Sequence, residues 1–111
     1  MTPLPILDRE TALSALGNDR ETYDIVLETY LETTPDLLSQ MKAALARSDM
    51  ETLQRHAHSL KSSSRTIGAL ELGERAQGLE SACHSQNPGM VGLLVEEVNC
   101  GFEELKKKVA D

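Results

Sequence analysis

Aromatic and β-branched residues are scarce in this sequence. It contains no Trp, one Phe and two Tyr, and Leu and Ala together far outnumber Val and Ile. This composition favours helix over strand, and no useful stretch alternates between apolar and polar residues with a period of two. We therefore expect an all-α protein.

Long apolar runs are also missing. No stretch approaches the roughly 18 consecutive apolar residues that a membrane span needs, and the first residues lack the basic start and apolar run of a secretion signal. Two cysteines, Cys83 and Cys100, do not make a disulfide framework. These absences predict a cytoplasmic protein with no membrane insertion.

Basic residues are in deficit, with 11 Lys and Arg against 18 Asp and Glu, which gives a net charge of −7. Such a chain lacks the positive field that drives phosphate-backbone binding, so we expect no nucleic-acid partner. Its glycines form no phosphate-binding loop, and 111 residues leave no room for a separate nucleotide-binding domain. We expect a single helical domain over 1–111 with a short N-terminal lead, 1–7.

Apolar residues recur at helical spacing along the whole chain. The caps and breaks predict six helices, at about 8–16, 19–31, 34–47, 49–66, 70–84 and 91–109. The boundary between the second and third rests on Thr33-Thr34-Pro35-Asp36, because a Thr cap followed by Pro and an acid is a helix start. Short connections make helices antiparallel neighbours. The predicted fold is an up-and-down antiparallel four-helix bundle with extra short N-terminal helices.

The helix at 49–66 carries the candidate chemistry. The core-facing stripe of this helix has small residues at its centre. His58 lies roughly 140° around the helix from that stripe and therefore faces solvent, whereas His56 lies near the core boundary. A neutral imidazole is a nucleophile, and the Lys61 ammonium one turn on both disfavours the imidazolium and can pair with a phosphoryl group. The other residues around His58 are Gln54, Arg55, Ser62 and Arg65.

Other interpretations of the histidines remain open from spacing alone. An exposed His among basic neighbours is most often an ordinary surface residue. His56 and His58 are two apart on different faces, unlike the i, i+4 pair of a helical zinc site, so no metal site is predicted. His84, near the end of its helix, fits a surface or capping role.

One segment resembles a known signature. Ala57-His58-Ser-Leu60-Lys61-Ser-Ser-Ser-Arg-Thr-Ile67-Gly68-Ala69 is similar to the motif of histidine phosphotransfer (HPt) domains, which reads Ala-His-x-Leu-Lys-Gly-small-small-x-x-apolar-Gly-Ala. The resemblance extends to the segment from Tyr30 to Leu38 and to Leu79-Glu80. One departure is Ser62, where the family usually has Gly beside the imidazole.

The resemblance implies a carrier that relays a phosphoryl group between His58 and an aspartate of response-regulator receiver domains, with Lys61 as electrostatic support. It implies docking over Gln54, Arg55, Ser62 and Arg65, and a structural turn at Gly68. The protein would have no cofactor and no ATP-dependent kinase activity, since Mg²⁺ belongs to the receiver. Sensor or hybrid histidine kinases are the other expected partners, and the carrier is expected to be a monomer. The alternative is a non-catalytic helical adaptor or scaffold that binds receiver or kinase domains.

Overall fold

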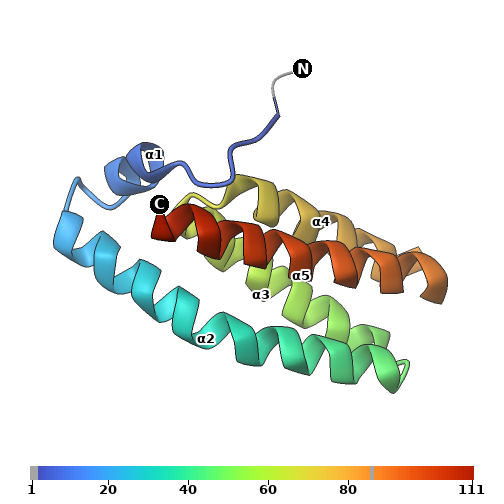
Figure 1. The fold of residues 1–111 in the computed structure, drawn as a ribbon. Helices are drawn as coiled ribbons and strands as arrows, with labels where there is room; N and C mark the ends of the chain where they lie inside the picture. The colour runs from blue at the N-terminus through green and yellow to red at the C-terminus, as the bar shows by residue number, and fades with distance from the viewer. Residues whose placement is uncertain (1–2, 86) are drawn as a thin grey trace.

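A computed structural model describes residues 3–85 and 87–111. Residues 1 and 2 of the predicted lead and residue 86 of the break before the last helix lie outside the described residues. The described chain forms five helices and no strand: α1 (Arg9–Ala15), α2 (Arg20–Ala46), α3 (Met50–Ile67), α4 (Leu70–Ser85) and α5 (Pro88–Ala110). Figure 1 shows the long helices α2–α5 side by side, with α1 at the end where α2 begins and α5 ends. The predicted all-α bundle is confirmed.

Helix starts follow the sequence closely. Asp8, Asp19 and Asp49 each accept a hydrogen bond from the backbone N–H three residues on, as predicted for N-caps. Asn87 does the same for α5, which begins with Pro88 at its first turn, inside the predicted break. None of the described helices is long and apolar enough to cross a membrane.

The prediction of a helix boundary at Thr33–Asp36 is wrong, because α2 runs unbroken through Pro35 and the extra N-terminal elements reduce to α1 alone. Proline inside a helix typically costs about 3 kcal/mol and removes a backbone donor. Two threonine hydroxyls donate to carbonyls of the preceding turn, Thr33 to Thr29 at 2.9 Å and Thr34 to Tyr30 at 2.6 Å. Continuous burial offsets this cost, since one largely apolar stripe crosses the proline: Tyr23, Leu27, Tyr30, Thr34, Leu38, Met41 and Ala44.

The core forms where these stripes meet. Helix α3 packs between α2 and α4, while α5 packs against α4 and α2 and so lies diagonally opposite α3. At the α2–α3 contact the Tyr30 hydroxyl and the buried Ser64 hydroxyl are 2.8 Å apart, and the Tyr30 ring meets Phe102 of α5 edge-on. Burial raises the pKa of Tyr30 to about 12, so its hydroxyl stays neutral. These contacts fix the rotation of α3 relative to α2.

Candidate phosphotransfer site

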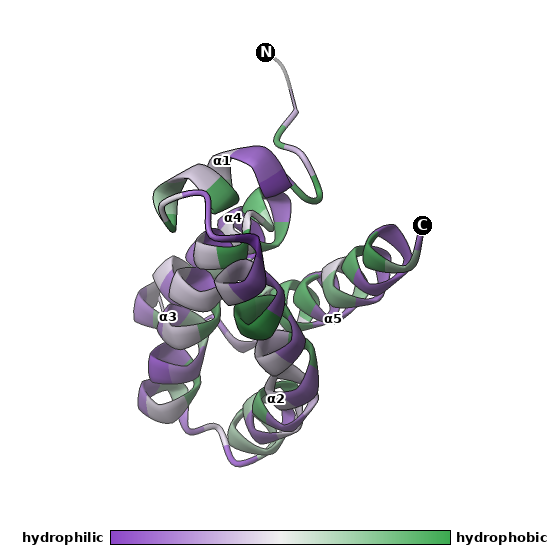
Figure 2. Ribbon diagram, turned by 90° about the vertical axis from the view of Figure 1, so that its left-hand side faces the viewer, coloured by the Kyte–Doolittle hydropathy of each residue, from purple (hydrophilic) through white to green (hydrophobic). Residues whose placement is uncertain are grey.

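His58 lies in the middle of α3, on the side turned away from the core. Its side chain is 61% exposed, whereas Ala57 and Leu60 are fully buried. Figure 2 shows this outer side of α3 as predominantly hydrophilic. His56 is half-buried, at the boundary of the core, as the helical periodicity predicts. The two histidines therefore occupy different environments, and His58 is the one that a partner protein can reach.

A carboxylate from the neighbouring helix binds both predicted functional side chains. Glu80 of α4 lies 2.8 Å from His58 Nδ1 through Oε2 and 2.7 Å from Lys61 Nζ through Oε1. Lys61 and Glu80 are largely buried, with side chains 15% and 17% exposed. The three residues form one linked group, His58–Glu80–Lys61, which joins α3 to α4.

This contact changes the expected electrostatics. From the sequence, the positive charge of Lys61 acts directly on the imidazole; in the structure the ammonium is paired, and the charge that touches the ring is negative. The hydrogen bond from Lys61, and to a smaller extent that from His58, lowers the pKa of the Glu80 carboxyl below its ordinary value of 4.5. Glu80 is therefore ionised at neutral pH and accepts hydrogen bonds only.

An ionised Glu80 determines the tautomer of His58. Because the carboxylate can only accept, Nδ1 must carry the proton that it donates to Glu80. In the neutral ring Nε2 then holds the free lone pair. The pairing thus leaves Nε2 as the ring nitrogen with a free lone pair, a point that the sequence leaves open.

The other predicted residues differ in what their side chains contact. On the α4 side, the Gln54 amide lies 2.8 Å from the ring nitrogen Nε2 of His84, and Arg65 packs its stem near Gly73. Arg55 is exposed and donates to Thr52 of its own helix. Ser62 is exposed. The sequence did not predict the pairing of His58 with Glu80, and its only signal for that pairing was the family-like Leu79-Glu80. It also did not predict the contact between His84 and Gln54.

A shallow apolar groove lies between α2 and α3. Its volume is about 340 Å³. On α3 it is lined by Ser63, Thr66 and Ile67, in the last turns of the helix. Its α2 wall includes Ile25, an aliphatic side chain left 59% exposed. The groove is lined by Ile25, Val26, Thr29, Tyr30, Thr33, Ser63, Thr66 and Ile67.

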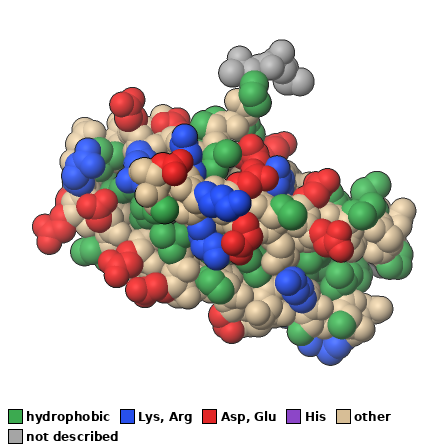
Figure 3. Space-filling model, in the orientation of Figure 1, with side chains coloured by type: hydrophobic (Ala, Val, Ile, Leu, Met, Phe, Trp, Pro, Cys, Tyr) green, Lys and Arg blue, Asp and Glu red, His purple; other side chains and the backbone are tan. Residues whose placement is uncertain are grey.

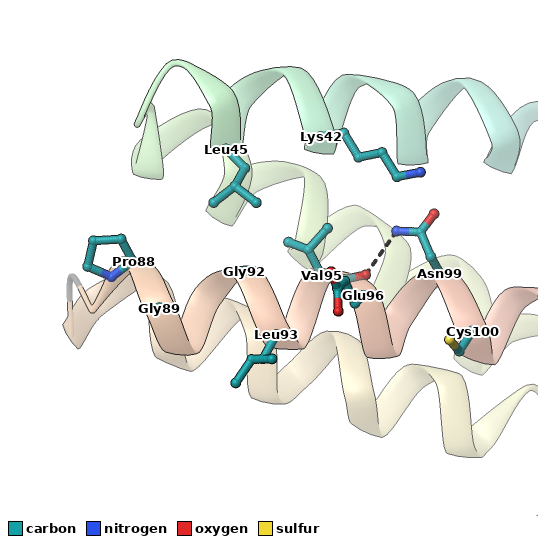
Figure 4. A pocket seen from close by; sticks show the side chains of 10 residues that line it. All are labelled: Lys42, Leu45, Pro88, Gly89, Gly92, Leu93, Val95, Glu96, Asn99 and Cys100. Atoms are coloured by element: carbon teal, nitrogen blue, oxygen red, sulfur yellow. Dashed lines mark hydrogen bonds between the residues drawn. The ribbon is translucent and has the colours of Figure 1, made fainter.

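A second groove, of about 700 Å³, lies between the end of α2 and the first half of α5 (Figure 4). Its polar side chains do not converge, and the Asn99 amide is already bonded to the Val95 carbonyl. The face formed by α2 and α5 mixes acidic, basic and apolar side chains and shows no histidine (Figure 3). Within the described residues no group of three or more His, Cys, Asp or Glu is placed to hold a metal ion. The candidate functional side chains, which are His58, Lys61 and Glu80, lie instead on α3 and α4.

Comparison with known proteins identifies the family. The family described as Hpt domain matches residues 25–109. The structure of histidine-containing phosphotransfer protein B (HptB) from Pseudomonas aeruginosa PAO1 superposes with a TM-score of 0.83 at 26% identity, covering 91% of this chain and 88% of that one. The Hpt domain of a sensor hybrid histidine kinase from Shewanella shares the fold, with a TM-score of 0.71, 20% identity, and coverage of 95% and 94%. A search of curated proteins gives no match.

The matched segment spans α3, α4 and nearly all of α2 and α5. The chain belongs to the Hpt domain family, and it acts in histidine phosphotransfer of two-component phosphorelays. Members of this family are phosphoryl carriers that interact with kinases and receiver domains.

Proposed function

We propose that His58 is the phosphorylated residue and that Nε2 is the attacking atom. Its lone pair attacks the phosphorus of an aspartyl phosphate on a receiver domain, the P–O bond to the aspartate breaks, and the carboxylate leaves with the electron pair. The ring gains positive charge as the P–N bond forms, and Glu80, 2.8 Å from Nδ1, stabilises that charge. The reverse sequence passes the phosphoryl group to the next receiver.

Lys61 supports this step through Glu80. Its ammonium holds the carboxylate in place at 2.7 Å, and it has further N–H donors for the oxygens of a phosphoryl group on the neighbouring ring. The receiver supplies the aspartate and the Mg²⁺. This chain then needs no cofactor and no nucleotide, and it works as a carrier without ATP-dependent kinase activity.

The observation that carries the proposal is the linked group His58–Glu80–Lys61, because an exposed nucleophile with a fixed tautomer is what a carrier needs and a passive adaptor does not. A monomer in the cytoplasm, with receiver domains and a sensor or hybrid kinase as partners, completes the proposal. A panel of purified receivers, each phosphorylated and mixed with the protein, tests it. Acid-labile, base-stable phosphate on His58 supports the carrier, and tight receiver binding without transfer supports the adaptor.

Docking should extend from His58 across the α2–α3 groove. A transient signalling interface buries less than about 1,200 Å² in total, or about 600 Å² of each protein, and in this proposal it runs from the ring over Arg55 and Ser62 to the exposed Ile25. An apolar centre with a polar rim is the usual make-up of such an interface. We propose that Ile25 is the apolar anchor on α2.

Ile25→Glu should lower the rate of transfer from a cognate receiver about tenfold at subsaturating concentrations, as the loss of one apolar anchor costs about 1.4 kcal/mol. Rapid-quench transfer assays measure the change. Leu93→Glu is the matched control, because Leu93 of α5 is 61% exposed and Ile25 is 59% exposed. If the two variants transfer at the same rate, the receiver does not use this groove.

Glu80→Ala should remove the preference of His58 for the Nδ1–H tautomer and slow phosphoryl acceptance by about tenfold or more. The amide oxygen of Glu80→Gln can still accept from Nδ1–H, so its rate of acceptance should lie between those of wild type and Glu80→Ala. Imidazole ¹⁵N spectra report the tautomer directly. The wild type should show a protonated Nδ1, and the Ala variant should move toward the Nε2–H form that predominates for a histidine side chain in water. An unchanged spectrum in Glu80→Ala would show that the contact does not set the tautomer.

The Lys61–Glu80 pair also predicts a pH dependence of stability. The pKa of Glu80 is lower in the folded protein than its ordinary 4.5, mainly because Lys61 donates to it. The ionised group therefore stabilises the fold above that ordinary value, and this contribution is lost as the pH falls through the lower folded pKa. The difference in unfolding free energy between wild type and Glu80→Gln should shrink as the pH drops from neutral to about 3.

A further inference from the structure

Ser62 lies on the same face of α3 as His58, one turn toward the C-terminal end of the helix. It lies four residues beyond His58, and side chains at that spacing are neighbours on a helix, with Cβ atoms about 5–6 Å apart. Helical side chains lean toward the N-terminus of the helix, so the exposed Ser62 hydroxyl leans back over the turn that carries His58. Glu80 holds Nδ1, which leaves Nε2 as the edge available to a bound group.

The hydroxyl of Ser62 is free to donate, unlike those of Ser63, Ser64 and Thr66, which follow it on α3. Ser63 donates to the Leu60 carbonyl at 3.3 Å, Thr66 donates to the Ser62 carbonyl at 3.0 Å, and Ser64 is buried against Tyr30. Within the described part of the chain, the Ser62 hydroxyl has no such partner. A serine in a helix often donates to the carbonyl four residues back, so its freedom here leaves a donor on the surface beside the nucleophile.

We propose that the Ser62 hydroxyl donates a hydrogen bond to the phosphoryl group on His58 and thereby lengthens the lifetime of the phosphohistidine. This inference rests on the proposed function of His58. It gives Ser62 a direct role toward the phosphoryl group, in addition to any contact with a receiver. Lys61 is tied to Glu80 on the α4 side, and Ser62 supplies a donor outside that ion pair.

The chemistry explains why a donor slows the loss of phosphate. In hydrolysis a water oxygen bonds to phosphorus, the P–Nε2 bond breaks, its electron pair returns to the ring nitrogen, and inorganic phosphate leaves. The transition state is loose and resembles metaphosphate, which carries less negative charge on its oxygens than the dianionic phosphoryl group. A donor to those oxygens therefore stabilises the phosphohistidine more than the transition state, and the barrier rises.

The experiment measures the half-life of the phosphorylated full chain without any receiver present. The protein is loaded with phosphoramidate and, separately, by a phosphorylated receiver that is then removed, and the decay is followed by intact mass and ³¹P NMR. We compare wild type with Ser62→Ala, Ser62→Gly and Ser62→Thr. The matched control is Ser59→Ala, an exposed serine of the same helix that is adjacent to His58 in sequence but not on its face.

Ser62→Ala and Ser62→Gly should both decay about fivefold faster than wild type, equivalent to about 1 kcal/mol at 1.4 kcal/mol per factor of ten. Ala and Gly shift helix stability in opposite directions, so equal effects would point to the lost hydroxyl. Ser62→Thr and Ser59→Ala should decay like wild type. Equal half-lives in all variants, or phosphate found on Ser62 itself, would overturn the inference. Failure of wild type to load on His58 from either donor would instead refute the proposed function, and this inference with it.

Discussion

His58→Gln should abolish phosphoryl acceptance while leaving the bundle folded. The substitution removes the only nitrogen with a free lone pair in the His58–Glu80–Lys61 group, and the glutamine amide is not a nucleophile that could replace it. Because the side chain is 61% exposed, the change in unfolding free energy should be within about 0.5 kcal/mol, apart from the lost contact with Glu80. Incubation with a phosphorylated cognate receiver, followed by intact mass, measures acceptance, and circular dichroism measures the fold.

His56→Gln provides the internal control for this result. His56 lies two residues away on the same helix, is half-buried, and has no contact with Glu80 among the interactions of the described residues. It should accept phosphoryl groups at a rate close to that of wild type. If His56→Gln were silent and His58→Gln active, the assignment of the nucleophile would be wrong.

The sequence predicts most of the fold because its local signals agree with one another. Aspartate caps, the Gly68 stop and apolar residues at steps of three and four all mark the same helices, and such agreement is what allows a pattern to be read without a structure. Pro35 is the exception. Local chemistry there indicates a helix start, but the buried stripe through Tyr30, Thr34 and Leu38 keeps the helix continuous. That outcome depends on tertiary burial, which no local rule contains.

The site is predicted in part for the same reason. The exposure of His58 and its nearness to Lys61 follow from helical geometry within α3. The pairing with Glu80 does not, because Glu80 is 22 residues from His58 and on another helix. Whether a Glu of α4 reaches α3 depends on the rotation of α4, which the packing of its buried face fixes. The sequence could thus indicate the candidate nucleophile, but not the tautomer of His58 or the charge in contact with its ring.

Gly68 couples the site-bearing helix to the start of the chain. It is the C-cap of α3 with φ +88°, in the left-handed region. Its carbonyl accepts from the Asp8 backbone N–H at 2.8 Å, and Glu71 at the start of α4 donates to the Pro5 carbonyl at 3.0 Å. A Cβ at Gly68 would overlap the backbone carbonyl of Asp8. The turn between α3 and α4 therefore requires glycine for both its conformation and the close approach of the N-terminal segment.

Gly68→Ala should therefore be severely destabilising, by more than about 3 kcal/mol, because left-handed strain of about 1–2 kcal/mol adds to a clash between backbone atoms that cannot move independently. Gly17→Ala separates the backbone strain from the clash, since Gly17 also has a positive φ, +73°, but nothing lies within 4 Å of an added Cβ. This substitution should cost only the strain, about 1–2 kcal/mol. Urea unfolding followed by circular dichroism measures both. Because the turn sets how α4 lies against α3, the surviving folded Gly68→Ala protein should also show a perturbed Glu80–His58 contact in its imidazole ¹⁵N spectrum. Equal destabilisation by the two substitutions would mean that the N-terminal segment does not pack against Gly68 in solution.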